Sequence, residues 1–193
     1  MPNTLFLVLD MINDLIHEDG PNGKKGYGPI LERRNTIANT AIAIAKARAA
    51  GVKIGYVRVG FSPDYREVAS NSGVFMGAKK AGLFKLGTWG TQVHPKLAPK
   101  PEDYDIIKHR VSPFYATTLE PILGANQITK LVLCGVSTTG AVLSAAKDGH
   151  DRDYDITILD DCSAAITDEH HKVTLEMVAR FATITTAAEI TFP

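Results

Sequence analysis

Short apolar runs recur along the chain, separated by segments with helical spacing, and this alternation constrains the fold more than any other feature. The five clear runs are Leu5–Leu9, Lys53–Val57, Asp105–Lys108, Lys130–Cys134 and Asp155–Leu159, and a weaker sixth is Ala182–Thr185. Because the runs are apolar throughout and do not alternate with polar residues, they are typical of strands covered by helices on both faces. The order of runs and helical segments predicts an α/β fold with three α/β/α layers and a doubly wound, mostly parallel, six-stranded sheet.

The segments between the runs contain the expected helices. These are Arg33–Ala50, Val68–Ala81, Thr138–Gly149 and Asp168–Phe181. The first ends before Gly51, a residue common after helix C-termini, and Thr167 is a suitable N-cap for the last. Residues 60–104 are otherwise rich in Gly, Pro, Ser and Lys. A long excursion of this kind usually covers or lines a functional site.

Composition and charge narrow the classes of function. With 193 residues, 45% of them hydrophobic and 22% charged, the chain is expected to form one globular domain over residues 1–193. Its 21 basic and 21 acidic residues leave no net charge, so neither nucleic acid nor a membrane surface is an expected partner. The N-terminus has no signal-peptide pattern, and no run reaches the roughly 18 apolar residues of a membrane span.

The two cysteines, Cys134 and Cys162, lie at the ends of apolar segments. Free cysteines in such places are commonly buried, and so few cysteines indicate a reducing compartment. We therefore expect a cytoplasmic protein in which both thiols are structural.

Polar residues at the ends of the predicted strands are the first candidates for chemistry. Asp10 follows the first run, Lys108 ends the third, and the fourth leads into the turn 135–141. In open parallel sheets, ligands bind beyond the carboxyl ends of the strands, so these residues are expected to share one edge. Each also has an ordinary structural interpretation, since a strand-end Asp often caps a turn and a strand-end Lys is often solvated.

Three motifs in order give the chain a resemblance to the isochorismatase-like hydrolases, most of which are cysteine hydrolases of small amides. The motifs are LVLDMINDL at 7–15, IIKHRVSPF at 106–114 and LCGVSTTGAVLSAA at 133–146. The resemblance implies a Rossmann-like fold and identifies Asp10 as the catalytic carboxylate and Lys108 as the catalytic lysine. It places Ala141 at the position of the cysteine nucleophile, so the nucleophile itself is absent.

The resemblance also assigns roles to the turn around position 141. A thiol in the first turn of a helix beside a lysine favours the thiolate, and a nearby carboxylate can take and return its proton. Backbone N–H groups of the turn then stabilise the oxyanion, and the turn residues concerned are Val136, Ser137, Thr138 and Gly140. A cis peptide bond between Val136 and Ser137 is implied as well.

Three interpretations of Ala141 stay open from the sequence. The chain could be an engineered Cys→Ala variant, because the flanking STTG and VLSAA resemble cysteine-bearing members, and this is the interpretation we favour. It could be a nucleophile-free vinyl-ether hydrolase like the true isochorismatases, although those have Tyr-Ala-His where this chain has Ser137, Thr138 and Thr139. It could also be a non-catalytic relative that only binds a small molecule.

The sequence predicts neither a metal nor another cofactor. Nicotinamidases of the family hold a metal through histidines after the second strand, and the matching stretch VRVGFSPDYREV has none. The adjacent pair His170 and His171 is expected to be a solvated helix start rather than a ligand set.

The expected partner is a small-molecule amide, bound in a pocket with aromatic walls. Candidate lining residues in the excursion or near strand ends are Arg58, Phe61, Trp89, Phe114 and Tyr115. The aromatic residues could equally belong to the core, and Arg58 could equally form a surface ion pair. The resemblance implies a homodimer or homotetramer.

Overall fold

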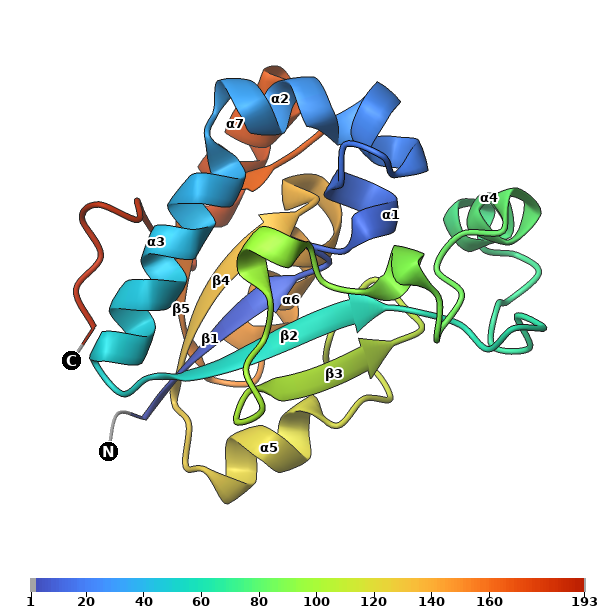
Figure 1. Cartoon of the computed structure of the whole chain (residues 1–193). Coiled ribbons are helices and arrows are strands. Elements are labelled where there is room, and N and C mark those ends of the chain that lie inside the picture. Colours follow the sequence, from blue (N-terminus) through green and yellow to red (C-terminus); the bar gives the residue numbers. More distant parts are fainter. Residues whose placement is uncertain (1–2, 193) are drawn as a thin grey trace.

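The computed structural model describes residues 3–192 and contains a six-stranded parallel sheet in the order β3-β2-β1-β4-β5-β6 (Figure 1). The strands are β1 (Thr4–Leu9), β2 (Lys53–Val59), β3 (Tyr104–Lys108), β4 (Lys130–Val136), β5 (Asp155–Ala164) and β6 (Thr183–Thr185). Each expected apolar run lies in or overlaps one of these strands. The predicted fold class is therefore confirmed.

Helices cover both faces of the sheet, as Figure 1 shows for α3 on one side and α6 on the other. The α-helices are α1 (Asn13–Ile16), α2 (Gly28–Arg33), α3 (Thr36–Ala49), α4 (Gly73–Ala81), α5 (Leu119–Ala125), α6 (Leu143–His150) and α7 (Asp168–Val178). Shorter helical turns are η1 (Gly23–Tyr27), η2 (Trp89–Thr91), η3 (Pro95–Leu97) and η4 (Thr138–Val142).

Strand β1 shows how the sequence builds two cores. Phe6 and Val8 pack with Ala43 and Ile44 of α3, whereas Leu5, Leu7 and Leu9 pack with residues of α5, α6 and α7. Successive strand side chains point to opposite faces, so a strand that is apolar at every position serves both layers. Full burial of each large apolar side chain contributes about 1.5–3 kcal/mol.

The helix expected over Arg33–Ala50 is interrupted, and this boundary was wrong. Asn35 takes a left-handed conformation with φ of 57°, so α2 ends at Arg33 and α3 begins at Thr36. Asparagine adopts this conformation more readily than most residues, and the apolar spacing gives no sign of the break. The expected C-terminal role of Gly51 is confirmed by its φ of 72°.

The strand order places the carboxyl ends of β1 and β4 side by side. The chain adds strands in opposite directions on the two sides of this pair, so the strand order reverses here. Leu9 of β1 pairs with Gly135 of β4, and the residues that follow both strands emerge together. Crevices at such a switch point are the usual ligand sites of open α/β sheets.

Within residues 3–192, none of the helices combines the length and the apolar character that crossing a membrane requires.

Candidate active site

Asp10 and Lys108 form a buried ion pair at the carboxyl edge of the sheet. The Lys108 Nζ lies 2.8 Å from Asp10 Oδ2, and the two side chains are 3% and 7% exposed. The other carboxylate oxygen, Oδ1, accepts a 2.7 Å hydrogen bond from the N–H of Val59. Asp10 thus reaches across the end of β2 from β1 toward β3, and it does so with a positive φ of 54°. Such backbone conformations in non-glycine residues are uncommon and concentrate at functional sites.

The charge state of this pair is set by opposing effects. Burial raises the pKa of the Asp10 carboxyl, while the Lys108 ammonium and the Val59 N–H favour its charged form. Lys108 also donates a 3.2 Å hydrogen bond to the carbonyl of Arg110. A buried carboxyl with a raised pKa next to a fixed cation is suited to accept and return a proton.

Near the end of β4, position 135 has a backbone conformation and a close contact that only glycine tolerates. Gly135 has a φ of 126°, and a Cβ there would lie 2.0 Å from the carbonyl oxygen of Leu9. One residue further on, the peptide bond between Val136 and Ser137 is cis, which confirms the expectation. The close approach to β1 brings the turn next to Asp10.

The N–H groups of this turn are not all free for an oxyanion. Those of Gly140 and Val142 both donate to the carbonyl of Ser137, at 3.1 and 3.2 Å. The expectation that Gly140 contributes a free donor is therefore wrong, because its N–H closes the turn itself. The N–H of Ser137 has no partner in the part of the chain that the structure describes.

Ala141 lies on η4 and is only 4% exposed. It packs in the apolar cluster that also contains Leu9 and Val57, which come from the two strands that flank Asp10. The structure thus places position 141 in the wall between β1 and the helices rather than on the outer surface.

Tyr27 lies near the candidate site although no sequence pattern selected it. Its phenol lies near the side chain of Ser137, whose hydroxyl favours the charged form of the phenol. Burial raises the pKa of Tyr27, and the charge of the nearby Asp10 carboxylate raises it further. The residue reaches the site from η1, a π-helical turn in a Gly-rich segment whose path has no periodic signal in the sequence.

The expected pocket residues divide into three groups. Arg58 is not free for a substrate, because its guanidinium binds the Asp105 carboxylate in bidentate fashion at 2.6–2.7 Å and donates to the Thr91 carbonyl. Phe61 and Phe114 are buried in apolar clusters, so the core alternative holds for both. Their assignment as lining residues is corrected.

Trp89 and Tyr115 are the exposed members of the expected wall, at 44% and 63%. Tyr115 lines a cavity of about 130 Å³ together with Glu67, His109, Arg110 and Ala116. One of these lining residues, Arg110, accepts the hydrogen bond of Lys108, but neither Lys108 nor Asp10 itself lines the cavity. A second, larger cavity of about 610 Å³ near α2 and α3 is lined by none of the candidate catalytic residues.

Only one of the two histidines at the start of α7 has the solvent exposure that was expected. His170 is exposed, but His171 is 3% exposed and packs inward. Its position one turn before Leu175 and two turns before Val178, both buried, is a helical face pattern that could have signalled this. Residues 3–192 contain no group of three His, Cys, Asp or Glu side chains arranged to hold a metal ion, and the absence of a metal stays a prediction.

Cys134 and Cys162 are both free and buried. Burial raises the pKa of each thiol well above its ordinary value, so neither is a thiolate at neutral pH. This supports the prediction that both are structural.

We expect iodoacetamide to alkylate each of the two cysteines in the folded protein at pH 7.5 more than about tenfold more slowly than it alkylates free cysteine. Both thiols should react after unfolding in denaturant, as mass spectrometry would show. Rapid modification of the folded protein at either position would contradict their assignment as inert core residues.

Comparison with known proteins shows the same fold and family over nearly the whole chain. Residues 4–189 match the isochorismatase domain family. The chain is 32% identical over 177 residues to "Ureidoacrylate amidohydrolase RutB" of Methylorubrum extorquens, covering 83% of this chain and 69% of that protein. It is 30% identical over 171 residues to "Probable inactive nicotinamidase At3g16190" of Arabidopsis thaliana, with 88% and 84% covered.

A solved structure has the same fold over nearly the whole chain. The N-carbamoylsarcosine amidase of Thermoplasma acidophilum is 28% identical and superposes with a TM-score of 0.77, covering 97% of this chain and 98% of the other. The similarity therefore extends over both layers of helices and the whole sheet.

Proposed function

Because the chain belongs to the isochorismatase family of hydrolases, we propose that its site is that of an amidohydrolase, which cleaves a C–N bond of a small molecule through a thioester on residue 141. The buried Asp10–Lys108 pair at the carboxyl edge of the sheet is the observation that carries this proposal. Two relatives named as an amidohydrolase and an amidase support the reaction class. With alanine at position 141, the chain itself is proposed to be inactive.

We assign each group a step in this reaction. A thiol at position 141 passes its proton to Asp10, and the thiolate attacks the carbonyl carbon, forming a C–S bond. The oxyanion accepts a hydrogen bond from the free N–H of Ser137, and Lys108 holds the negative charge nearby. As the C–N bond breaks, the proton on Asp10 passes to the leaving amine. Water then gives a proton to Asp10 and attacks the thioester, and the C–S bond breaks to release the acid and restore the thiol.

We propose that Ala141 replaces a cysteine. Two elements that would serve a nucleophile are present, namely the buried ion pair and the helical turn that follows β4. An unpaired lysine or carboxylate at such depth would be costly, so the pair is expected to be retained for use. The relative named as probably inactive is the counterexample that an experiment must address.

One observation favours a second candidate function. Burial raises the pKa of Asp10, and this favours the protonated carboxyl that a general acid needs. Such an acid could protonate a vinyl ether without any nucleophile at position 141. This alternative predicts turnover by the chain with alanine in place, whereas the amidohydrolase proposal predicts none.

The amidohydrolase proposal can be tested on the unaltered protein. The substrates named for the two relatives carry a carbamoyl group on nitrogen, so N-carbamoyl amino acids and simple amides form the first panel. We expect at least one of them to raise the melting temperature at millimolar concentration, because ligand that binds only the folded state stabilises it, and to be recovered unchanged after hours. Binding without product supports the proposal; hydrolysis of a vinyl ether by this chain would favour the second candidate.

A further inference from the structure

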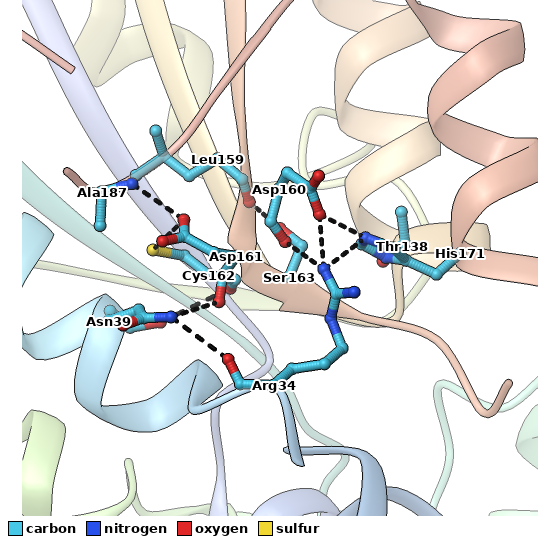
Figure 2. A network of polar contacts seen from close by, with 11 residues as sticks. Arg34, Asn39, Thr138, Leu159, Asp160, Asp161, Cys162, Ser163, His171 and Ala187 are labelled. Atoms are coloured by element: carbon cyan, nitrogen blue, oxygen red, sulfur yellow. Dashed lines mark hydrogen bonds and ion pairs between the residues drawn. The ribbon is translucent and has the colours of Figure 1, made fainter. Parts of the chain in front are cut away.

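Four side chains from four parts of the chain meet behind the turn that follows β4 (Figure 2). Thr138 Oγ1 lies 2.7 Å from His171 Nδ1, and His171 Nε2 lies 2.8 Å from Asp160 Oδ1. Arg34, directly after α2, places its Nη2 2.5 Å from the same carboxylate oxygen and 2.9 Å from His171 Nε2. Thr138 is fully buried and His171 is 3% exposed.

The proton positions in this network depend on the tautomer of His171. The hydrogen bond from His171, with help from the charge of Arg34, lowers the pKa of Asp160, so this carboxylate is ionised and only accepts. His171 Nε2 has two polar neighbours: one tautomer donates a proton from Nε2 to Asp160, and the other accepts a hydrogen bond at Nε2 from the Arg34 guanidinium, which is a donor only. In the first tautomer the Thr138 hydroxyl donates to Nδ1, and in the second Nδ1 donates to the Thr138 hydroxyl. In both tautomers Thr138 Oγ1 is hydrogen-bonded to His171.

Backbone hydrogen bonds close the turn but its N-cap side chain does not cap it, so the contact from Thr138 to His171 is a further restraint on it. Ser137, the N-cap of η4, makes no side-chain hydrogen bond to the N–H groups of that turn. Thr138 is the residue next to Ser137, whose N–H is the proposed oxyanion donor, and it lies three residues before position 141. Thr138 and His171 are buried, whereas Arg34 and Asp160 are half-buried and Arg34 Nε has no partner among the described residues. Displacement of Thr138 would leave Nδ1 of the buried His171 ring unpaired, and this cost favours one geometry of the turn.

We propose that His171, held by Asp160 and Arg34, is a positioning residue that fixes Thr138 and thereby aligns the Ser137 N–H and position 141 with the Asp10–Lys108 pair. This inference rests on the proposed function of that site. His171 contacts none of the reacting groups, since its two ring nitrogens are bonded to Thr138 and to Asp160. Its contribution is therefore geometric, and misplacement of about 1 Å at a reacting centre can lower a rate by about 100-fold.

The test uses paired variants in an Ala141→Cys background. Thr138→Val removes the hydroxyl at nearly constant shape, and Thr138→Ser keeps it. His171→Leu removes both nitrogens, and His171→Asn keeps a polar atom near the place of Nδ1. His170→Leu is the matched control, one residue away on the same helix and exposed. We expect Thr138→Val and His171→Leu to lower kcat by 10- to 100-fold with KM within about threefold. Thr138→Ser, His171→Asn and His170→Leu should stay within about fivefold of the background.

A second readout needs no substrate. The rate of alkylation of the thiol introduced at position 141, followed against pH, reports its pKa. We expect Thr138→Val to shift this profile to higher pH and to slow alkylation at pH 7 at least threefold, because the thiolate loses its aligned N–H groups and lysine. Thr138→Ser should leave the profile in place.

The two readouts separate this inference from the proposed function. If the Ala141→Cys background hydrolyses nothing but Thr138→Val still shifts the alkylation profile, the proposed function fails and the positioning role stands. If the background is active and Thr138→Val matches Thr138→Ser in both kcat and alkylation, the positioning role is overturned. Should His171→Leu not fold, the Thr138 pair alone decides.

Discussion

The Ala141→Cys variant is expected to release ammonia or amine from at least one small amide or N-carbamoyl acid, at a rate at least about 1,000-fold above that of the unaltered chain. The substitution adds one sulfur atom near the start of a helix, and the proposed site places it beside Lys108, a setting that stabilises a thiolate. The rest of the proposed machinery, Asp10 and Lys108, is already in contact at 2.8 Å. Ammonia release, measured by a coupled assay across the panel, is the readout.

Matched variants show whether the new activity uses this site. Ala141→Ser adds a hydroxyl of similar size that does not ionise near neutral pH, so it should remain inactive. In the Ala141→Cys background, Asp10→Asn and Lys108→Ala should each remove most of the activity. The double change should be little worse than either single one, because residues that act as a unit give non-additive losses. Activity that survives Asp10→Asn would contradict the assigned proton transfer.

Lys108→Met is expected to lower the free energy of unfolding by about 3–5 kcal/mol at pH 7, the largest stability effect of any single change we propose. The side chain is 3% exposed, and its loss leaves the Asp10 carboxylate buried without its cation. Adding Asp10→Asn to Lys108→Met removes that charge and should recover much of the loss. Denaturant unfolding of the two single variants and the double variant gives the coupling energy of the pair.

The pH dependence of Lys108→Met has a definite sign. Burial raises the pKa of Asp10, and without the ammonium less opposes that effect. At low pH the carboxyl is protonated in both states; as the pH rises past the ordinary aspartate pKa, the unfolded chain loses its proton first. The variant should therefore lose stability as the pH rises, until the pH passes the folded pKa.

The exposed pair Lys130–Asp155 supplies the control. Its side chains are 51% and 61% exposed and 3.7 Å apart, so Lys130→Met should cost less than about 1 kcal/mol. Equal losses for the two lysine variants would mean that burial of the Asp10–Lys108 pair has no energetic consequence, and the account of that pair would be wrong.

The fold could be predicted because its strongest determinant is local. A strand such as β1 that is apolar at every position must be covered on both faces, and strands alternating with helices leave few topologies. The interruption at Asn35 could not be predicted in the same way, because the apolar spacing continues on both sides of it. One residue in a left-handed conformation decides that boundary.

The site could be predicted only where residues stand at strand ends. Asp10 and Lys108 meet because parallel strands end at one edge, a rule that needs no contact information. Tyr27 and His171 reach the turn from α-helical or π-helical segments far away in the sequence, and their partners are fixed by packing. The engagement of the Gly140 N–H with Ser137 is likewise a property of the folded turn.

The thioester at position 141 can be sought in the intact mass of the Ala141→Cys variant, quenched in acid within seconds of mixing with a substrate from the panel. We expect a covalent adduct with the mass of the acyl part of the substrate. It should be present on this variant, removed by hydroxylamine, and absent from the unaltered chain and from Ala141→Ser. The adduct should accumulate further when Asp10→Asn slows hydrolysis of any thioester that forms. If amine is released with no adduct at any time or in any variant, or if the adduct maps to Cys134 or Cys162, the thioester at position 141 is contradicted.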